Sequence, residues 1–322
     1  MIVIVSQEYD CSTNDVMDWL IAWRKDIVRI NETDTINSIY SKINDNEYSL
    51  YIRCGEKEFC LSKVDFFWFR RSGFVFDVSF LSNVNASFAS HIEEHLLDEC
   101  KTMKEFIVYL LENKPFLGNY HQGNANKLIS LFIAKQVGLK IPNTIISSSK
   151  NDLSKFYEEH KSCITKSIQD VLCFFINEYR FFTTTSIVES KDIENMNKVF
   201  FPSLLQNNLC KRYELRIFYL KGKCYSMAIF SQENQQTALD FRNYSTDKPN
   251  RYVPYLLPKH IEEQLDLFMK KMNLDTGSID MIVTPDFDYV FLEVNPVGQY
   301  DMVSVPCNYY LHKKIAQTLC HE

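Results

Sequence analysis

The sequence predicts an α/β (α+β) fold in which helices and strands alternate along 322 residues. Hydrophobic residues make up 46% of the chain and aromatic residues 14%, which is enough apolar side chain for two or three packed cores. Short runs of β-branched residues alternate with stretches in which apolar residues recur at helical spacing. This order of strands and helices is typical of layered α/β units.

The charge and the cysteines narrow the class of protein. A net charge of -6 argues against non-specific binding to nucleic acid, which needs a dominant basic field. The ten cysteines include no CxxC pair, and Met1–Ser6 lacks the charged and apolar regions of a secretory signal. No apolar stretch is long enough to span a bilayer. We therefore expect a cytoplasmic protein with reduced cysteines, whose partners include neither nucleic acid nor a membrane.

The first part of the chain has the pattern of a small α/β layer. One of its strands, Val64–Arg71, ends in two arginines directly before Ser72 and Gly73. Lys114 and Pro115 mark the predicted boundary of this part. Its predicted elements are a strand at 2–5, a helix at 14–23, a strand at 26–30, a hairpin at 48–61, the strand at 64–71 and one or two amphipathic helices at 86–112.

The remainder of the chain begins with a helix for which Asn124 is the predicted N-cap and Gly138 the predicted stop. Further on, the segment 202–211 is predicted as a strand with an exposed backbone. The other predicted elements are an extended segment at 141–146, a polar helix that ends near 159, strands at 162–166 and up to 185, a hairpin at 213–228, a helix at 260–272, a hairpin at 278–295 and a final helix at 313–319.

The hairpin at 278–295 carries acidic residues inside two apolar strands. If its four-residue loop closes a regular hairpin, Thr284 faces Tyr289 across the ladder. Counting outward from that pair places Asp280 opposite Glu293 on one face of the sheet. Asn295 shares this face because side chains of a strand alternate with a period of two.

Two carboxylates and one amide oxygen would then lie close to one point. Like charges on opposite strands destabilise a sheet unless a cation lies between them. Hard oxygen ligands of this number suit Mg²⁺, which completes its octahedron with water and phosphate oxygens. The alternative is a solvated acidic face beside a turn, although that leaves the acidic residues within apolar strands unexplained. Spacing alone leaves both interpretations open.

Several basic residues are candidates for contacts with an anionic ligand. Lys166 ends an apolar strand, from which an ammonium group can point into a cleft. Arg216 shares one face of its predicted strand with Glu214. Arg242 lies in a polar loop, and the fork of a guanidinium group suits phosphate oxygens. Read alone, each of these residues, like Lys127, is also typical of a solvated lysine or a surface ion pair.

Other catalytic motifs receive little support. The segment His91–His95 fits the zinc pattern H-x-x-E-H, but so short a pattern arises easily by chance and lies in an ordinary amphipathic helix. The chain has no G-x-S-x-G elbow, and its eight glycines form neither a Walker-type phosphate loop nor a GxGxxG. We therefore expect neither a zinc site nor a nucleophilic side chain.

Taken together, these segments resemble the ATP-grasp superfamily of ligases, over about residues 119–319. The segment Ser278–Gln299 looks like its magnesium-binding segment, and Lys166 looks like its lid lysine. Residues 126–128 and 138–144 are similar to the segment that precedes the lid. Residues 206–211 are similar to the hinge that binds adenine, and residues 214–216 are similar to the ribose and phosphate contacts.

The resemblance implies an ATP-grasp fold with an N-terminal pre-ATP-grasp domain at 1–118, a central lid domain at 119–200 and a C-terminal core domain with the metal site at 201–322. It implies ATP and two Mg²⁺ ions, with Asp280, Glu293 and Asn295 as metal ligands. The catalytic residues that it implies are Lys166, Arg216 and Arg242. The nucleotide contacts that it implies are Lys127, Lys166, Gln206, Asn207, Asn208, Leu209, Lys211, Glu214, Arg216 and Arg242.

Within the superfamily, the pattern is most similar to the graspetide synthetases, and above all to the grasp-with-spasm type. The motifs that support this similarity are Phe67–Arg71, Ser231-Gln232, Leu239–Arg242 and, after the last strand, Asn295–Gln299. One departure is Ser167–Asp170, which replaces a glycine-containing phosphate loop of the related glutamate ligases.

This branch implies a ribosomally made precursor peptide as substrate, with a leader and a core. Its Glu or Asp side chains would be phosphorylated and joined to Ser or Thr hydroxyls or Lys amines, giving macrocyclic esters or amides. A homodimer is also expected. One alternative is a glutamate ligase of the ribosomal-protein-modifying type, which adds free amino acids to a protein. A second alternative is a non-catalytic peptide-binding protein.

Overall fold

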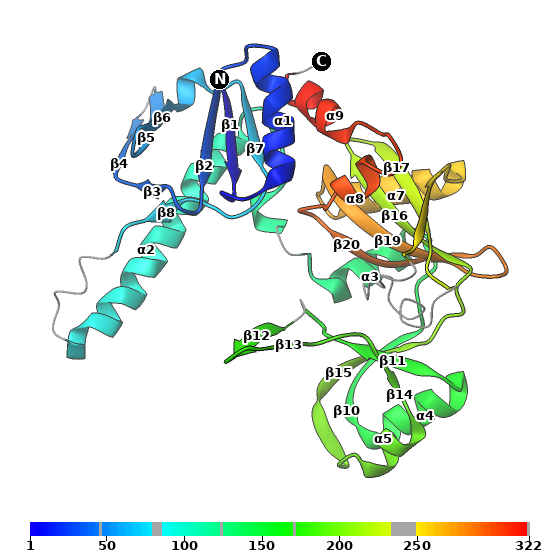
Figure 1. The fold of residues 1–322 in the computed structure, drawn as a ribbon. Helices are drawn as coiled ribbons and strands as arrows, with labels where there is room; N and C mark the ends of the chain where they lie inside the picture. The colour runs from blue at the N-terminus through cyan, green and yellow to red at the C-terminus, as the bar shows by residue number, and fades with distance from the viewer. Residues whose placement is uncertain (45–46, 79–85, 123–124, 170–171, 233–248, 321–322) are drawn as a thin grey trace. The chain divides into compact units, whose positions relative to one another are not determined.

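The computed structural model describes residues 1–44, 47–78, 86–122, 125–169, 172–232 and 249–320, and its chain forms two compact units (Figure 1). Unit 1 contains Met1–Gly123, Leu274–Thr276 and Asn308–Glu322, and unit 2 contains Asn124–Asn273 and Gly277–Cys307. Helices and strands alternate in both, which confirms the α/β class. The division into three domains at 118 and 200 stays a prediction.

Unit 1 is built on a parallel sheet with the strand order β2-β1-β7-β9. Its strands are β1 (Ile2–Ser6), β2 (Ile27–Asn31), β7 (Phe66–Phe69) and β9 (Phe116–Leu117). Helix α1 (Cys11–Ala22) connects β1 to β2, while β7 pairs with the other side of β1. The strand order therefore reverses between β1 and β7, and such switch points are where open α/β sheets hold ligands.

The remaining elements of unit 1 pack against this sheet or extend from it. Helix α2 is one continuous helix, and its C-terminal half buries Ile107, Val108 and Leu111 in the same core as Phe67. Strand β4 is not among the predicted elements, because most of its side chains are exposed and give no apolar alternation. The elements are β3 (Thr35–Ile36), β4 (Ser38–Asn44), β5 (Glu47–Cys54), β6 (Lys57–Cys60), β8 (Val75–Phe76), α2 (Ala86–Glu112) and α9 (Leu311–Leu319).

Unit 2 contains a four-stranded sheet with the order β10-β15-β11-β14. Helices α4 and α5 contribute Phe156 and Ile193 to a core that also holds Leu205. The elements of this layer are β10 (Thr144–Ser149), α4 (Lys150–His160), β11 (Cys163–Lys166), β14 (Ser186–Val188), α5 (Ser190–Asn195) and β15 (Val199–Asn207). The predicted strand at 202–211 is thus present, but the expectation of an exposed backbone is wrong up to Asn207, because β15 pairs with a strand on each side.

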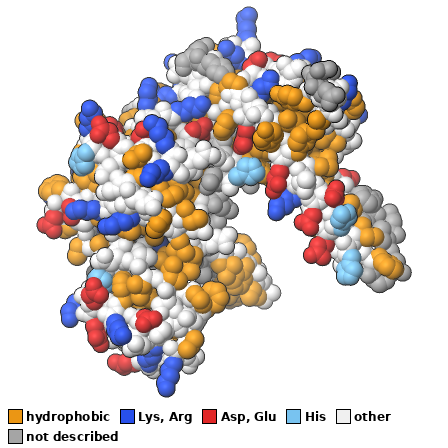
Figure 2. All heavy atoms as spheres, turned by 180° about the vertical axis from the view of Figure 1, so that it is seen from behind, with side chains coloured by type: hydrophobic (Ala, Val, Ile, Leu, Met, Phe, Trp, Pro, Cys, Tyr) orange, Lys and Arg blue, Asp and Glu red, His pale blue; other side chains and the backbone are white. Residues whose placement is uncertain are grey.

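A hairpin of β12 (Cys173–Ile176) and β13 (Tyr179–Phe182) belongs to unit 2 but pairs with no other strand in the described part of the chain. Both strands are exposed along their whole length, and hydrophobic side chains gather on this hairpin in Figure 2. Phe174 and Phe181 stack across the two strands with ring centroids 5.3 Å apart. Such an exposed apolar surface is typical of a binding surface.

The second sheet of unit 2 has the order β18-β17-β16-β19-β20 and contains the predicted acidic hairpin. Helix α7 (Lys259–Lys271) buries Leu265 and Phe268, and Phe268 lies 4.8 Å from the ring of Phe291 on β20. The strands are β16 (Tyr213–Leu220), β17 (Lys223–Phe230), β18 (Arg251–Tyr255), β19 (Thr276–Val283) and β20 (Tyr289–Asn295). A short helix α8 (Asp301–Ser304) follows.

Helix α3 (Lys127–Gln136) packs beside β20 and corrects one predicted boundary. Its N-cap is Asn126, whose side chain accepts hydrogen bonds from the backbone of Leu128 and Ile129, and not the predicted Asn124, which lies outside the described residues. Both asparagines are good caps by residue type, so only geometry decides between them. Gly138 has φ 86° directly after the C-cap, as predicted for the stop.

No helix among the described residues has the length and apolar character needed to cross a membrane. All ten cysteines are free thiols.

Candidate active site

Three adjacent strands of the second sheet in unit 2 each contribute one charged side chain to a row. Arg216 comes from β16, Asp280 from β19 and Glu293 from β20, in the strand order β16-β19-β20. Asp280 and Glu293 are direct cross-strand partners, as the sequence predicted. The row therefore places one cation beside two adjacent carboxylates.

The register that pairs these carboxylates differs from the expected one near the turn. Thr284 donates its backbone N–H to Asp288 at 3.0 Å, and Val283, not Thr284, faces Tyr289. This is a shift of one residue, which would have turned Glu293 to the opposite face. The register shifts back between Met281, which faces Phe291, and Asp280, so Leu292 is an extra residue in a β-bulge. The predicted pairing is right because the bulge cancels the error in the turn.

Asp280 and Arg216 form a buried ion pair. Asp280 Oδ1 accepts a hydrogen bond from Arg216 Nη1 at 2.6 Å, and both side chains are 6% exposed. Within the part of the chain that the structure describes, Asp280 Oδ2 and Arg216 Nε have no hydrogen-bond partner. Buried polar atoms normally have partners, so an unsatisfied carboxylate oxygen here indicates a place for a ligand.

Asn295 and Ser278 extend the oxygen-rich face by one pair. They are cross-strand partners, two residues from Glu293 and Asp280 along their strands. Asn295 is exposed, and its Oδ1 lies 3.3 Å from the backbone nitrogen of Gly298, in a turn where Gly298 has φ 63°. Ser278 Oγ is buried with no hydrogen-bond partner among the described residues. Ser278 is not among the predicted site residues, although its spacing of two from Asp280 places it on the same face.

The donor set of this face fits Mg²⁺. Carboxylate, amide and hydroxyl oxygens are hard ligands, and the free Asp280 Oδ2 is of the type that Mg²⁺ uses. The two cations beside the carboxylates, Arg216 and Lys127, are compatible with a site in which metal and phosphate charges balance. The residues that would hold the ion are Asp280, Glu293 and Asn295.

Lys127 lies beside this face at the start of α3. Its Nζ donates a hydrogen bond to the backbone oxygen of Gln169 at 2.6 Å and lies 3.9 Å from Glu293 Oε2. Gln169 belongs to the segment that follows β11 in the other sheet of unit 2. Lys127 therefore contacts both the acidic face and the segment that follows β11.

A second buried ion pair lies at the start of β16. Lys211 Nζ lies 2.7 Å from Glu214 Oε1, and Ser231 Oγ donates to the same oxygen at 2.7 Å. Burial raises the pKa of the Glu214 carboxyl, while Lys211 and Ser231 oppose that shift and the nearby Asp280 charge adds to it. Glu214 shares its face with Arg216, so the two buried pairs are neighbours on one side of the sheet.

The predicted hinge connects the two sheets of unit 2. Gln206 is buried, pairs with Thr144 and Ile164, and donates from Nε2 to Thr144 Oγ1 at 3.0 Å. Asn207 and Asn208 donate their backbone N–H groups to Asn143 and Ser162. Strand β15 ends at Asn207, so Leu209 and the residues up to Lys211 lie between β15 and β16.

Of the predicted basic residues, Lys166 and Arg242 have no described contact with this cluster. Lys166 ends β11, pairs with Leu204 and is partly buried. Arg242 and the motif Leu239–Arg242 fall outside the described residues. The structure thus brings together Lys127, Arg216, Asp280, Glu293 and Asn295, with Lys211 and Glu214 beside them.

No protein-family model matches the chain, and no curated protein matches it with significant similarity. Solved structures do match, over nearly the whole chain. A RiPP-associated ATP-grasp ligase from Chryseobacterium gregarium, in complex with ADP and a leader and core peptide, has a TM-score of 0.84 at 22% identity and covers 99% of this chain and 96% of its own. The macrocyclase MdnC from Microcystis aeruginosa, bound to precursor peptide MdnA, has a TM-score of 0.79 at 26% identity with full coverage of both chains.

A third match is the ATP-grasp ligase PsnB, solved with a phosphomimetic variant of its minimal precursor, Mg and ADP. It has a TM-score of 0.73 at 15% identity and covers 99% of this chain and 97% of its own. These matches agree with the resemblance carried by the sequence motifs. The chain therefore has the ATP-grasp fold, in the form that it takes in RiPP-associated ATP-grasp ligases and macrocyclases.

Proposed function

We propose that this protein is an ATP- and Mg²⁺-dependent ligase that phosphorylates Glu or Asp side chains of a ribosomal precursor peptide. It then joins them to Ser or Thr hydroxyls or to Lys amines of the same peptide, giving macrocyclic esters or amides, ADP and phosphate. The observation that carries this proposal is the row Arg216–Asp280–Glu293, in a fold shared over its full length with MdnC, a macrocyclase bound to its precursor peptide.

The proposed chemistry needs no nucleophilic side chain from the protein. A carboxylate oxygen of the peptide bonds to the terminal phosphorus of ATP, and the bond from that phosphorus to the ADP oxygen breaks. A hydroxyl or amine of the peptide then bonds to the acyl carbon, phosphate leaves with the carboxyl oxygen, and one proton is released. Each link therefore removes the elements of one water from the peptide.

In this proposal, the residues of the site act by position and charge. Asp280, Glu293 and Asn295 hold Mg²⁺, which when bound neutralises charge on the phosphates. Arg216 stays beside Asp280 and directs its remaining donors toward the transferring phosphoryl group. Lys127, Lys166 and Arg242 contact phosphate oxygens, and the stretch Gln206–Lys211 with Glu214 receives the adenosine.

The exposed hairpin β12–β13 is proposed as part of the surface that binds the peptide. Six of its large apolar side chains are between 41% and 73% exposed, which is unfavourable in water unless a partner covers them. They are Phe174, Phe175, Ile176, Tyr179, Phe181 and Phe182. The division into an N-terminal domain, a lid and a core, and the assembly as a homodimer, are also parts of this proposal.

The test uses the purified full-length protein, ATP, Mg²⁺ and a peptide encoded beside its gene that is rich in Ser or Thr and in Glu or Asp. A product lighter by one water per link, formed together with ADP, supports the proposal. A product that gains amino-acid mass indicates the glutamate ligase instead. If the peptide binds and no ADP is released, the protein is a non-catalytic peptide-binding protein.

A further inference from the structure

The motif Phe67–Arg71 leads to a polar cluster in unit 1 that the proposed ATP chemistry does not use. β7 ends at Phe69, and Arg70 and Arg71 follow at the carboxyl end of the sheet, directly beside the end of β1. Both arginines donate their backbone N–H groups to the oxygen of Val5, at 2.9 and 3.3 Å. The cluster therefore stands at the point where the strand order reverses.

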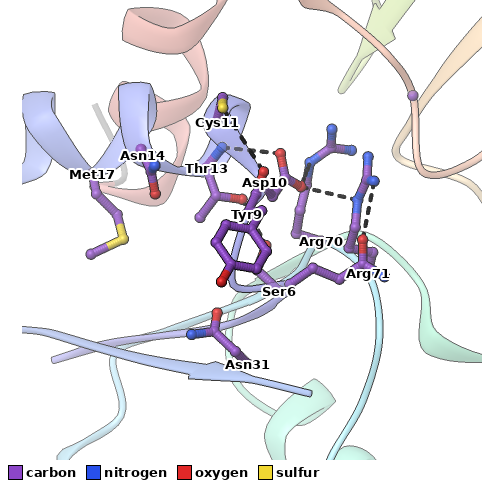
Figure 3. A network of polar contacts seen from close by, with 12 residues as sticks. Ser6, Tyr9, Asp10, Cys11, Thr13, Asn14, Met17, Asn31, Arg70 and Arg71 are labelled. Carbon is purple, nitrogen blue, oxygen red and sulfur yellow. Dashed lines mark hydrogen bonds and ion pairs between the residues drawn. The ribbon is translucent and has the colours of Figure 1, made fainter. Parts of the chain in front are cut away.

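One carboxylate holds both guanidinium groups, as Figure 3 shows. Asp10 Oδ2 lies 3.3 Å from Arg70 Nε and 3.0 Å from Arg71 Nε, and Asp10 itself is 7% exposed. In Figure 3 the terminal nitrogens of the two guanidinium groups point to the same side, away from this carboxylate. Because two cations share one carboxylate, Arg71 has no anion to itself among its described contacts.

The loops around this cluster are fixed by hydrogen bonds. Ser6 Oγ and Thr13 Oγ1 lie 2.8 Å apart in a buried position. Arg29 hydrogen-bonds to Asn31 Oδ1 at 2.8 Å and also to the backbone oxygen of Gln7. On the other side, Ser72 has φ 68°, a conformation that a residue with a side chain adopts at a cost of free energy. The arginine pair is thus held in one geometry before any ligand arrives.

Arg71 is the member of the pair that solvent reaches. Its side chain is 28% exposed, while that of Arg70 is 3% exposed. Apart from Asp10, its described side-chain contact is a long hydrogen bond of 3.4 Å from Nη1 to Gln7 Oε1, and its Nη2 has no described partner. An accessible guanidinium fork with a weak protein contact is a site for an oxyanion.

The geometry points to a carboxylate rather than a phosphate. Phosphate sites at helix N-termini use the free backbone N–H groups of the first turn. Here Asp10 is the N-cap of α1, and its side chain accepts from Thr13 N at 3.4 Å, so a negative charge already occupies that position. The fork of Arg71 can hold two oxygens of either group. The Asp10 carboxylate beside it, however, repels the two charges of a phosphate more than the single charge of a carboxylate.

We propose that Arg71, aligned by Asp10 and Arg70, binds a side-chain carboxylate of the acidic peptide substrate on unit 1. This inference rests on the proposed function for the identity of the ligand, but it concerns a different unit and different residues. Arg71 is a binding residue in this proposal, and Asp10 and Arg70 are positioning residues. The site would select precursor peptides by acidic residues, in addition to the chemistry at Asp280.

Fluorescence anisotropy tests this with the full-length protein and the peptide (Gly-Glu)3-amide, labelled with rhodamine at its N-terminus, against the (Gly-Gln)3-amide labelled in the same way. Wild type is expected to bind the Glu peptide and not the Gln peptide. Arg71→Gln is expected to weaken binding of the Glu peptide about tenfold or more, the scale of one charge-assisted hydrogen bond. Arg71→Lys keeps the charge without the fork and is expected to fall between the two.

Arg53→Gln is the matched control, because Arg53 is an exposed arginine of the same unit on β5. It is expected to bind like wild type, and thermal melting checks that each variant is folded. Equal binding of the two peptides by wild type, or unchanged binding by Arg71→Gln, overturns the proposal. Inorganic phosphate and N-acetylglutamate are also compared as competitors of the labelled peptide. If phosphate displaces the peptide at a lower concentration than N-acetylglutamate does, the site binds phosphate, and the proposal is overturned.

Binding of ADP with Mg²⁺ is measured on the same samples. Arg71→Gln is expected to bind ADP like wild type, because the proposed nucleotide contacts are all in unit 2. Loss of peptide selection with ADP binding intact would leave the proposed function standing. If wild type selects the Glu peptide but neither binds ADP nor releases ADP from ATP, the proposed function is refuted. The carboxylate site at Arg71 is then still supported.

Discussion

Asp280 faces Glu293 across β19 and β20 although the turn between the strands is one residue out of step with a regular hairpin. The extra residue, Leu292, restores the register before the two carboxylates meet. Arg216 lies 2.6 Å from Asp280, and Lys127 lies 3.9 Å from Glu293. The two carboxylates can therefore lie side by side without a metal ion. Asp280 Oδ2 is still available to bind a metal ion.

Asp280→Asn is expected to lower ADP release about a hundredfold and to weaken the dependence on Mg²⁺, because a charged ligand becomes neutral. It also leaves the buried Arg216 without its counter-charge, at a cost of about 3 kcal/mol in stability. Coupled assays of ADP over a range of Mg²⁺ concentrations measure the first effect and urea unfolding the second. Asp288→Asn, in the exposed pair with Lys140, is the control. Full activity in Asp280→Ala or Glu293→Ala would contradict the assignment of these residues as metal ligands.

Lys127→Ala is expected to raise the KM for ATP about tenfold, since it removes one charge-assisted contact to phosphate. Lys135→Ala serves as the control, because Lys135 is an exposed lysine on the same helix. Steady-state kinetics with varied ATP compare the two variants. A KM that rises equally in both would show that general charge, not the position of Lys127, is responsible.

Glu214→Gln is expected to flatten the pH dependence of stability. Because burial raises the pKa of Glu214 in the folded state, the folded protein holds this proton more tightly than the unfolded chain does. Its contribution to stability is therefore greatest at low pH and declines as the pH rises above about 4.5, the ordinary value for glutamate. Urea unfolding between pH 4.5 and about 7 measures the slope. Glu263→Gln, an exposed glutamate on α7, should leave the slope unchanged, and equal slopes for all three proteins would contradict the account.

The thiols are expected to differ in their rates of alkylation. Burial raises the pKa of Cys54 and Cys307 to about 11 and that of Cys224 to about 12, so their thiolates are scarce at pH 8. The exposed cysteines should react first with iodoacetamide, and they are Cys11, Cys173 and Cys210. Peptide mapping by mass spectrometry at short times decides this. Early modification of Cys224 in folded protein would be inconsistent with its burial.

The double substitution Phe175→Ser and Tyr179→Ser is expected to raise the KM for the precursor peptide several-fold, while binding of ADP stays constant. Both residues are exposed, at 69% and 73%, so their removal should not lower the melting temperature. Tyr40→Ser and Ile43→Ser, exposed on β4 in unit 1, form the control. If both double variants use the peptide equally well, the hairpin is not the docking surface.

Much of the fold was predictable because its strands and helices carry clear apolar periods, as in β1, α7 and the hairpin of β16 and β17. Errors arose where local patterns are degenerate. Asn124 and Asn126 are both acceptable caps, and only the backbone of α3 selects Asn126. Whether β15 is an edge strand depends on β10 and β11, which are distant along the chain, so its own residues could not reveal it.

The site was predictable to the extent that it follows from spacing on one element. Asp280, Glu293 and Asn295 share a hairpin, and the bulge at Leu292 happened to preserve the inferred pairing. The pairing of Arg216 with Asp280 joins strands 64 residues apart, and that of Asp10 with Arg70 joins segments 60 apart, so neither had a local signal. Such contacts are decided by how the chain folds back on itself.

The bulge at Leu292 also bears on how distant relatives are compared. Consider a pairwise alignment with a relative that has one residue fewer in this hairpin. If the gap is placed in the loop 284–288, Tyr289, Val290 and Phe291 are shifted by one position against their structural equivalents. An alignment that places the gap at Leu292 keeps both the turn and the acidic residues in their true columns. For a chain only 26% identical to MdnC, the position of a single gap thus determines whether Tyr289, Val290 and Phe291 are aligned with the residues that lie at their places in space.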